Sequence, residues 1–297
     1  QQLTSNQFFH VELNIAEGRA LSRLGQDPRQ ALSLFDDVKQ LLEHESQRQP
    51  QLMERYNAYL GDAYTLSGYV QRTLREYDQA TNDYIQARKY FAQMQQLDAS
   101  ADIAELRAQT SINLAYLDVQ QGNFERARRL MRQLTTSEAM EALSPYYQAL
   151  ALNVRSIVEM NLENRELALE LVSRAWDITG RVRHQRLRGM ISRQYGVALH
   201  ELMKVSRKPD TQPDAYFADA ERLFSNDSTN LIETFDEWSK YERTVAMLYR
   251  EQNDAANANI WLDRAERHID AAEALLTARE PNVIQAQLRQ GKAFIHR

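Results

Sequence analysis

The residue types best suited to chemistry are concentrated in one basic stretch. Residues 181–208 contain eight Lys or Arg and a single acid, Glu201, in a chain whose formal net charge is −5. Arginine binds carboxylates and phosphates with a planar fork, so the stretch could hold an acidic peptide, an acidic domain or a nucleic-acid backbone. The alternative is a solvated helix face that acids from neighbouring helices neutralise. The sequence leaves both open. The candidate basic patch comprises Arg181, Arg183, Arg186, Arg188, Lys204, Arg207 and Lys208.

Signals for catalysis, metal binding or cofactor binding are weak. The chain has six His and no Cys, and no two His share the spacing of a zinc-binding helix face. His184 and His200 would lie about 24 Å apart along one helix, too far to hold one metal ion. The sequence also lacks phosphate-binding glycine loops and the GxSxG turn of serine hydrolases. We therefore expect no enzyme activity, no cofactor and no metal.

The composition predicts an all-α protein. Only 9 Gly and 6 Pro occur in 297 residues, whereas a β-rich domain would need more turn residues. No run of about 18 apolar residues occurs, so we expect no membrane span. The absence of Cys is compatible with a reducing, cytoplasmic location. The chain starts Gln1-Gln2-Leu3-Thr4 without Met, from which we expect a segment of a larger protein or a processed chain.

One pattern of small and aromatic residues recurs and indicates paired helices. Residues 60–68 read Leu-Gly-Asp-Ala-Tyr-Thr-Leu-Ser-Gly, and an alternation of aromatic residues and Ala follows at Tyr77, Ala80, Tyr84 and Ala87. Small residues let two antiparallel helices approach closely, and we expect the aromatics to fill the gap between one pair and the next. The corresponding alanines elsewhere are Ala31, Ala127, Ala168, Ala220 and Ala258. With Ala80 included, successive alanines of this set are 38 to 52 residues apart.

This pattern resembles that of the tetratricopeptide family, whose standard repeat has about 34 residues. The resemblance covers nearly the whole chain and is closest in residues 56–87. The longer intervals are similar to those of diverged arrays in bacterial signal-transduction ATPases and helix-turn-helix regulators. The resemblance implies a single domain over 1–297: an all-α, right-handed superhelical solenoid of about six helix pairs with a C-terminal capping helix over 281–297.

The resemblance also implies a partner-binding groove lined by the first helix of each pair. Aligning those helices on their small residues gives a lining rich in amides, Tyr and Arg. Amides can bracket an extended peptide backbone, and Tyr and Arg are common binding hot spots. Because Gln is abundant throughout the chain, composition alone would also give this lining. The candidate groove residues are Arg55, Tyr59, Asp62, Gln109, Asn113, Tyr116, Gln120, Asn153, Arg193, Gln194 and Arg243.

The functional expectation is a protein- or peptide-binding scaffold or sensor module of a larger bacterial signalling or regulatory protein. The basic patch would suit an acidic partner. The alternative is a small-molecule-sensing superhelix of a transcriptional regulator or signal-transduction ATPase, which would need a closed pocket in place of an open groove. The acidic overall balance disfavours nucleic acid as a partner, and no membrane association is expected.

Overall fold

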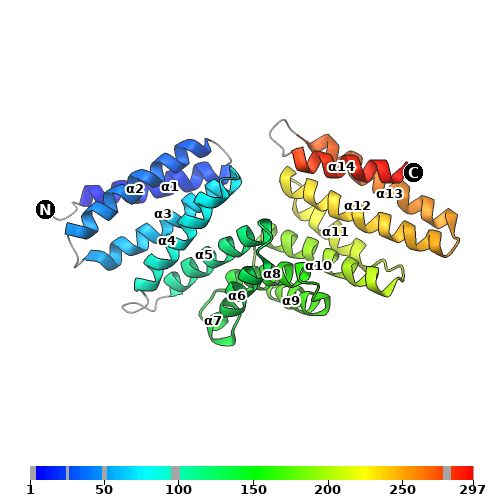
Figure 1. The fold of residues 1–297 in the computed structure, drawn as a ribbon, viewed down its shortest axis with the longest axis horizontal. Coiled ribbons are helices and arrows are strands. Elements are labelled where there is room, and N and C mark those ends of the chain that lie inside the picture. Colours follow the sequence, from blue (N-terminus) through cyan, green and yellow to red (C-terminus); the bar gives the residue numbers. More distant parts are fainter. Residues whose placement is uncertain (1–4, 25–26, 49–51, 95–100, 277–281, 297) are drawn as a thin grey trace. The chain divides into compact units, whose positions relative to one another are not determined.

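The computed structural model describes residues 5–24, 27–48, 52–94, 101–276 and 282–296. These residues form fourteen α-helices and no strand, and long neighbouring helices lie antiparallel (Figure 1). The helices are α1 (Ser5–Leu24), α2 (Pro28–Arg48), α3 (Met53–Thr73), α4 (Tyr77–Met94), α5 (Ala101–Gln120), α6 (Phe124–Leu134), α7 (Ser137–Glu141), α8 (Pro145–Asn161), α9 (Arg165–Thr179), α10 (Gln185–Ser206), α11 (Gln212–Leu223), α12 (Ser228–Glu251), α13 (Ala255–Leu275) and α14 (Asn282–Ile295). The all-α prediction of about six helix pairs followed by one further helix is confirmed.

The chain divides into two compact units, Gln1–Tyr147 and Gln148–Arg297, called unit 1 and unit 2 below. Unit 1 contains the pairs α1/α2, α3/α4 and α5/α6, and the short helix α7. Unit 2 contains the pair α8/α9 except the first residues of α8, the pairs α10/α11 and α12/α13, and the helix α14. The single domain over 1–297 stays a prediction.

The turn from first to second helix has the same geometry in four of the pairs. In α5/α6, Gly122 adopts a left-handed conformation with φ of 76°, and the Asn123 N–H donates to the Asp118 carbonyl at 2.7 Å. This bond across six residues is the Schellman arrangement that ends a helix. Equivalent bonds join Glu76 to Gln71, Asn164 to Glu159 and Asp254 to Tyr249, and the left-handed residues are Arg75, Glu163 and Asn253. The same Schellman turn therefore reverses the chain direction between the two helices of each of these pairs.

Glycines in first helices let aromatic rings of second helices lie directly on the backbone. A Cβ at Gly68 of α3 would lie 2.9 Å from the Tyr84 ring of α4. The same relation joins Gly18 to Phe35, Gly61 to Phe91, Gly189 to Phe224 and Gly196 to Phe217. Gly61/Gly68 and Gly189/Gly196 are each spaced by seven residues, as are their partner rings, which corresponds to about two helical turns. These rings therefore pack on the partner helix of their own pair. Tyr84 also clusters with Leu114 and Leu117 of α5, and Phe91 with Ile103, so the rings also pack against the next pair, as expected.

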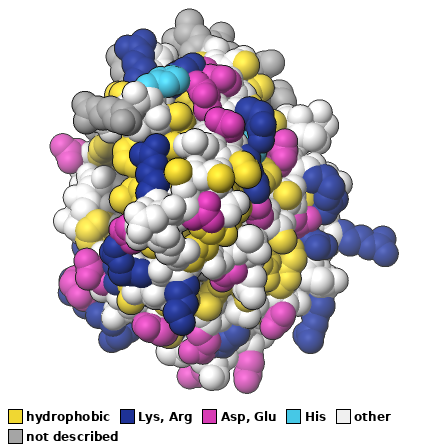
Figure 2. Space-filling view, turned by 90° about the vertical axis from the view of Figure 1, so that its right-hand side faces the viewer, with side chains coloured by type: hydrophobic (Ala, Val, Ile, Leu, Met, Phe, Trp, Pro, Cys, Tyr) yellow, Lys and Arg dark blue, Asp and Glu magenta, His cyan; other side chains and the backbone are white. Residues whose placement is uncertain are grey.

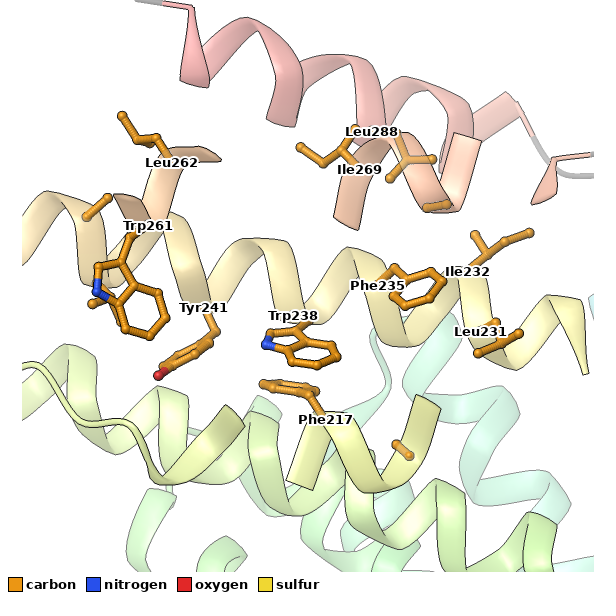
Figure 3. Close-up of a cluster of buried hydrophobic side chains, with 14 of the residues drawn as sticks. Phe217, Leu231, Ile232, Phe235, Trp238, Tyr241, Trp261, Leu262, Ile269 and Leu288 are labelled. Carbon is orange, nitrogen blue, oxygen red and sulfur yellow. The ribbon is translucent and has the colours of Figure 1, made fainter. Parts of the chain in front are cut away.

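A large core cluster in unit 2 combines aliphatic residues with aromatic residues of α11, α12 and α13 (Figure 3). The Trp238 ring is stacked on Phe217, with centroids 6.0 Å apart, and Trp261 meets Tyr241 edge to face. Trp238 and Trp261 are both buried. The indole N–H of Trp238 donates to Asp214 at 2.7 Å, which satisfies its one polar group.

Helix boundaries follow the local signals in the sequence. Helix α2 begins at Pro28, and the Asp27 carboxylate accepts a hydrogen bond from the Gln30 N–H at 3.0 Å, as expected of an N-cap. The break between α10 and α11 contains Pro209, and Pro213 lies in the first turn of α11. The first residue of the predicted capping helix over 281–297 lies outside the described residues. The short helix α7 was not anticipated.

Candidate functional site

A groove in unit 2 is lined by the first helices of its pairs, the elements from which the resemblance implied a binding surface. We call it the first-helix groove. It has a volume of about 390 Å³, and α12 contributes the largest share of its lining. The lining from α8 is Ile157, Met160 and Asn161, and that from α10 is Arg193, Gln194 and Val197. Helix α12 supplies Ile232, Glu233, Asp236, Glu237 and Lys240, and α14 supplies Gln287.

The charges in this groove are arranged in ion pairs. Arg193 pairs with Glu233 at 2.8 Å and also donates to the Asn230 backbone carbonyl at 3.2 Å. Lys240 lies 2.6 Å from Asp236 and 2.7 Å from Glu237. Burial lowers the pKa of the Lys240 ammonium, but Glu237 and Asp236 outweigh this effect and the pKa is raised. The groove therefore presents fixed charges in which carboxylates outnumber cations.

Two of the four predicted groove residues of unit 2 line the groove. Arg193 and Gln194 do so, and the Gln194 amide donates to the Ser156 hydroxyl at 3.4 Å. Asn153 is 1% exposed and is absent from the lining; its Oδ1 has no hydrogen-bond partner. Arg243 instead lies by α14, with its guanidinium 5.7 Å from the Phe294 ring centroid, and burial lowers its pKa.

The acids of α12 are the groove residues that the sequence analysis missed. Aligning this helix on Ala246 placed the groove positions near the C-terminal end of α12, which has 24 residues. Lys240 is among the aligned positions and lines the groove, but the rest of the charged lining lies nearer the N-terminal end, at Glu233, Asp236 and Glu237. Spacings of three and four residues place these charges on one helix face, and that periodicity was the available signal.

The predicted groove residues of α3 lie together but contact the neighbouring helix α1. The Arg55 guanidinium lies 3.8 Å from the Phe8 ring centroid, and the Tyr59 hydroxyl donates to Glu12 at 2.5 Å. Asp62 forms an ion pair with Arg19 at 2.6 Å. Burial raises the pKa of the Asp62 carboxyl, and the Arg19 charge offsets only part of this. These three side chains therefore join one helix pair to the next.

The remaining predicted groove residues lie along α5. The Gln109 amide oxygen accepts a hydrogen bond from the Tyr147 hydroxyl at 3.2 Å. Asn113 and Tyr116 are half-buried, and Gln120 is exposed at the end of the helix. Spacings of three and four residues place them on one face of α5. That this face binds a partner stays a prediction.

The seven residues of the basic patch fall into two groups at opposite ends of α10. Arg188 and Lys204 are 16 residues apart in sequence, which is about 24 Å along a helix. In the first group, Arg186 pairs with Asp227 at 3.3 Å and Arg188 with Asp219 at 3.7 Å, whereas Arg181 and Arg183 are exposed. In the second, Lys204 pairs with Glu201 and Arg207 with Glu251, and Lys208 is exposed.

Acids therefore neutralise four of these seven cations, as the solvated-face interpretation expects. On the face drawn in Figure 2, Lys and Arg are likewise interspersed with Asp and Glu and do not gather in one area.

The buried acid Glu242 takes part in an ionic cluster between α12 and α13. It is fully buried and contacts Arg264 at 2.9 Å and His268 at 2.7 Å. Arg264 also binds both Asp214 oxygens, at 2.8 and 2.7 Å.

Within the described residues, no group of three or more His, Asp or Glu side chains could hold a metal ion, and no helix is long and apolar enough to cross a membrane.

Comparison with known proteins finds similarity in the fold alone. No family model matches the chain, and no curated protein sequence matches it. The apo form of RapI matches with 13% identity and a TM-score of 0.56, covering 88% of this chain and 99% of RapI. BtubC (BKLC) from P. vanneervenii matches with 14% identity and a TM-score of 0.55, covering 86% and 96%. A tetratricopeptide repeat protein from Parabacteroides merdae covers 95% of this chain and 99% of its own, with 16% identity and a TM-score of 0.42.

The repeated hairpins, with glycine under an aromatic ring and a Schellman turn between the helices, make the fold tetratricopeptide-like.

Proposed function

We propose that this chain is a non-enzymatic module that binds an extended segment of a partner protein along the first helices of unit 2. The observation that supports this most directly is the first-helix groove, to which three successive first helices and α14 contribute polar and charged side chains. Such a surface serves as a scaffold or sensor within a larger bacterial signalling or regulatory protein.

The chemistry of the groove suits a peptide backbone. Asn161, Gln194 and Gln287 each offer an amide donor and acceptor, the two groups that an extended backbone presents in alternation. The ion pairs of Arg193 and Lys240 hold the intervening charges in place before a partner binds, which reduces the entropy lost on binding.

The groove is open to solvent, which favours a peptide over an enclosed small molecule. The Glu233 side chain is 48% exposed although it lines the groove. The small-molecule sensor considered as the alternative would need a closed pocket, in which most of the ligand surface is buried.

The charge balance favours a partner segment that carries Lys or Arg. Glu233, Asp236 and Glu237 line the groove against only Arg193 and Lys240. An acidic segment would add a negative charge beside an excess of carboxylates, whereas a basic one would complement it. The acidic partner expected from the basic patch has less support, because four of those seven cations already have acidic neighbours.

Selection of peptides from a random display library on the full chain, followed by calorimetry of the selected peptides, tests this function. We expect selected sequences to be enriched in Lys or Arg. We expect Glu237→Gln and Gln194→Ala to weaken their binding about tenfold or more. Glu166→Gln, at an exposed position of the second helix α9, is the matched control. Failure to select any peptide, or equal binding by Glu237→Gln and wild type, would contradict the proposal.

A further inference from the structure

A second and larger cleft lies in unit 1, and its lining includes none of the residues predicted for the groove. It is formed by the second helices α4 and α6, the first helix α5 against which both pack, and the short helix α7. Its volume is about 740 Å³. Sites for small molecules typically occupy about 300–1,000 Å³, so the cleft is large enough for one.

Apolar side chains line most of this cleft, and many of them are small. Ile103 of α5, Leu130 of α6 and Leu143 after α7 are at most 8% exposed and form buried parts of the wall. Alanines contribute from α4, α5 and α7, among them Ala92, Ala104 and Ala139. Because an alanine side chain ends at Cβ, these positions leave room that an apolar ligand body would fill.

Cations dominate the charged part of the same cleft. Arg88 and Lys89 of α4 and Arg107 of α5 line it, with Glu138 as the one carboxylate among the lining residues. Arg107 is half-buried, and burial together with the neighbouring charge of Arg88 lowers the pKa of its guanidinium. An anion that lies between two arginines can accept charge-assisted hydrogen bonds from both.

We propose that this cleft binds an amphipathic anion of small-molecule size. Its alkyl or aryl body lies on the alanine- and leucine-lined wall, and its carboxylate or phosphate head lies between Arg88 and Arg107. The inference is independent of the peptide function, because the cleft and the first-helix groove belong to different units and share no residue.

Calorimetry of the full chain with decanoate, decyl phosphate and neutral decanol tests the proposal. The three probes share an apolar chain and differ in the head group, so the first two distinguish a carboxylate from a phosphate. We expect at least one anion to bind about tenfold or more tightly than decanol, and its binding to weaken as ionic strength rises. Equal binding of all three probes, or no binding of either anion, would overturn the proposal.

Substitutions of residues that line the cleft test whether the anion binds there. We expect Arg88→Gln and Arg107→Gln each to weaken anion binding about tenfold, because each loses a charge-assisted hydrogen bond. We expect Ala104→Phe, at a half-buried position, to abolish binding by filling the space for the ligand body. Arg132→Gln removes an exposed arginine of α6 that is absent from the lining, and should bind as wild type does.

Helicity and melting temperature identify any variant that fails to fold. Should Arg107→Gln fail to fold, Arg88→Gln at its exposed position still decides the outcome. Wild-type anion affinity in a folded Arg88→Gln variant, or an equal loss in Arg132→Gln, would count against the cleft. Peptides selected for the first-helix groove should bind unchanged in the Arg88 variant, so failure of one proposal is distinguishable from failure of the other.

Discussion

Gly61 of α3 lies directly beneath the aromatic ring of Phe91 of α4: a Cβ at Gly61 would stand 2.4 Å from Cε1 of that ring. Phe91 is fully buried, so its ring has little room to withdraw. Gly68 and Tyr84 repeat the relation in the same pair, and the pair α10/α11 has two such contacts. The spacing between these helices therefore depends on the absence of one carbon atom at each glycine.

Replacing this glycine should destabilise the protein. We expect Gly61→Ala to lower the free energy of unfolding by about 1–3 kcal/mol, because the added methyl overpacks a filled core. Urea denaturation followed by circular dichroism measures the change. Gly180→Ala is the control, since its Cβ would meet only the Asp177 carbonyl at 3.5 Å. Part of the loss should return in Gly61→Ala/Phe91→Leu; a double variant with a strictly additive loss would show that the ring contact is not the cause.

At the left-handed turn residues, adding a side chain should destabilise the protein, whereas removing one should not. No atom lies within 4 Å of a Cβ at Gly122, whose φ is 76°. Gly122→Ala should therefore destabilise through its backbone conformation alone, by about 1 kcal/mol. Glu163 adopts φ of 61° in the equivalent turn, so Glu163→Gly should be neutral or stabilising by up to about 1 kcal/mol. Equal unfolding midpoints for Gly122→Ala and wild type would contradict this account.

Removing the central cation of the buried ionic cluster should have a larger effect. Arg264→Leu leaves Glu242 fully buried with only His268 beside it, and leaves Asp214 without its bidentate partner. We expect a loss of about 3–5 kcal/mol, since breaking one side of a buried ion pair strands the other charge. Arg174→Leu removes an exposed pair with Glu170 and should change stability by less than about 1 kcal/mol. Similar losses in both variants would show that burial of the pair is unimportant.

The helix pairs could be predicted from the sequence because their signals are local. The pattern from Leu60 to Ala87 and the step Asp27–Pro28 depend on residues a few turns apart, and both correspond to the structure. The pair Gly189/Gly196 repeats the spacing of Gly61/Gly68, so the sequence also contained the signal for α10.

The binding surfaces could be predicted only in part because they depend on distant residues. Arg188 and Arg207 are paired with Asp219 and Glu251, and nothing near α10 in the sequence indicates these partners. The acids of the first-helix groove were missed because α12 is several turns longer than a standard repeat helix, so one anchor residue could not fix which turn faces the groove. The cleft in unit 1 combines four helices, which no single periodicity reveals.

The buried His200 should make stability depend on pH in the acid range. It is 4% exposed, and its Nε2 lies 2.9 Å from the Thr244 hydroxyl. Burial, and then the charges of Lys204, Lys240 and Arg243, lower its pKa to about 3. The pKa of His in the unfolded chain is about 6.5. As pH falls below this value, the unfolded state binds a proton at this His and the folded state does not, so the folded state loses stability relative to the unfolded state. Stability from this residue is therefore complete above about pH 6.5 and is lost progressively toward pH 3.

The matched variant isolates this effect from other titrating groups. Between pH 7.5 and pH 5, we expect the wild type to lose about 2 kcal/mol more than His200→Gln, which keeps a hydrogen-bonding side chain but has no ionising group. Urea denaturation of both proteins at the two pH values gives the difference directly. The acids that titrate in this range are present in both proteins, so their contributions cancel. Parallel pH profiles for wild type and His200→Gln would mean that His200 accepts its proton in the folded state as readily as in the unfolded one.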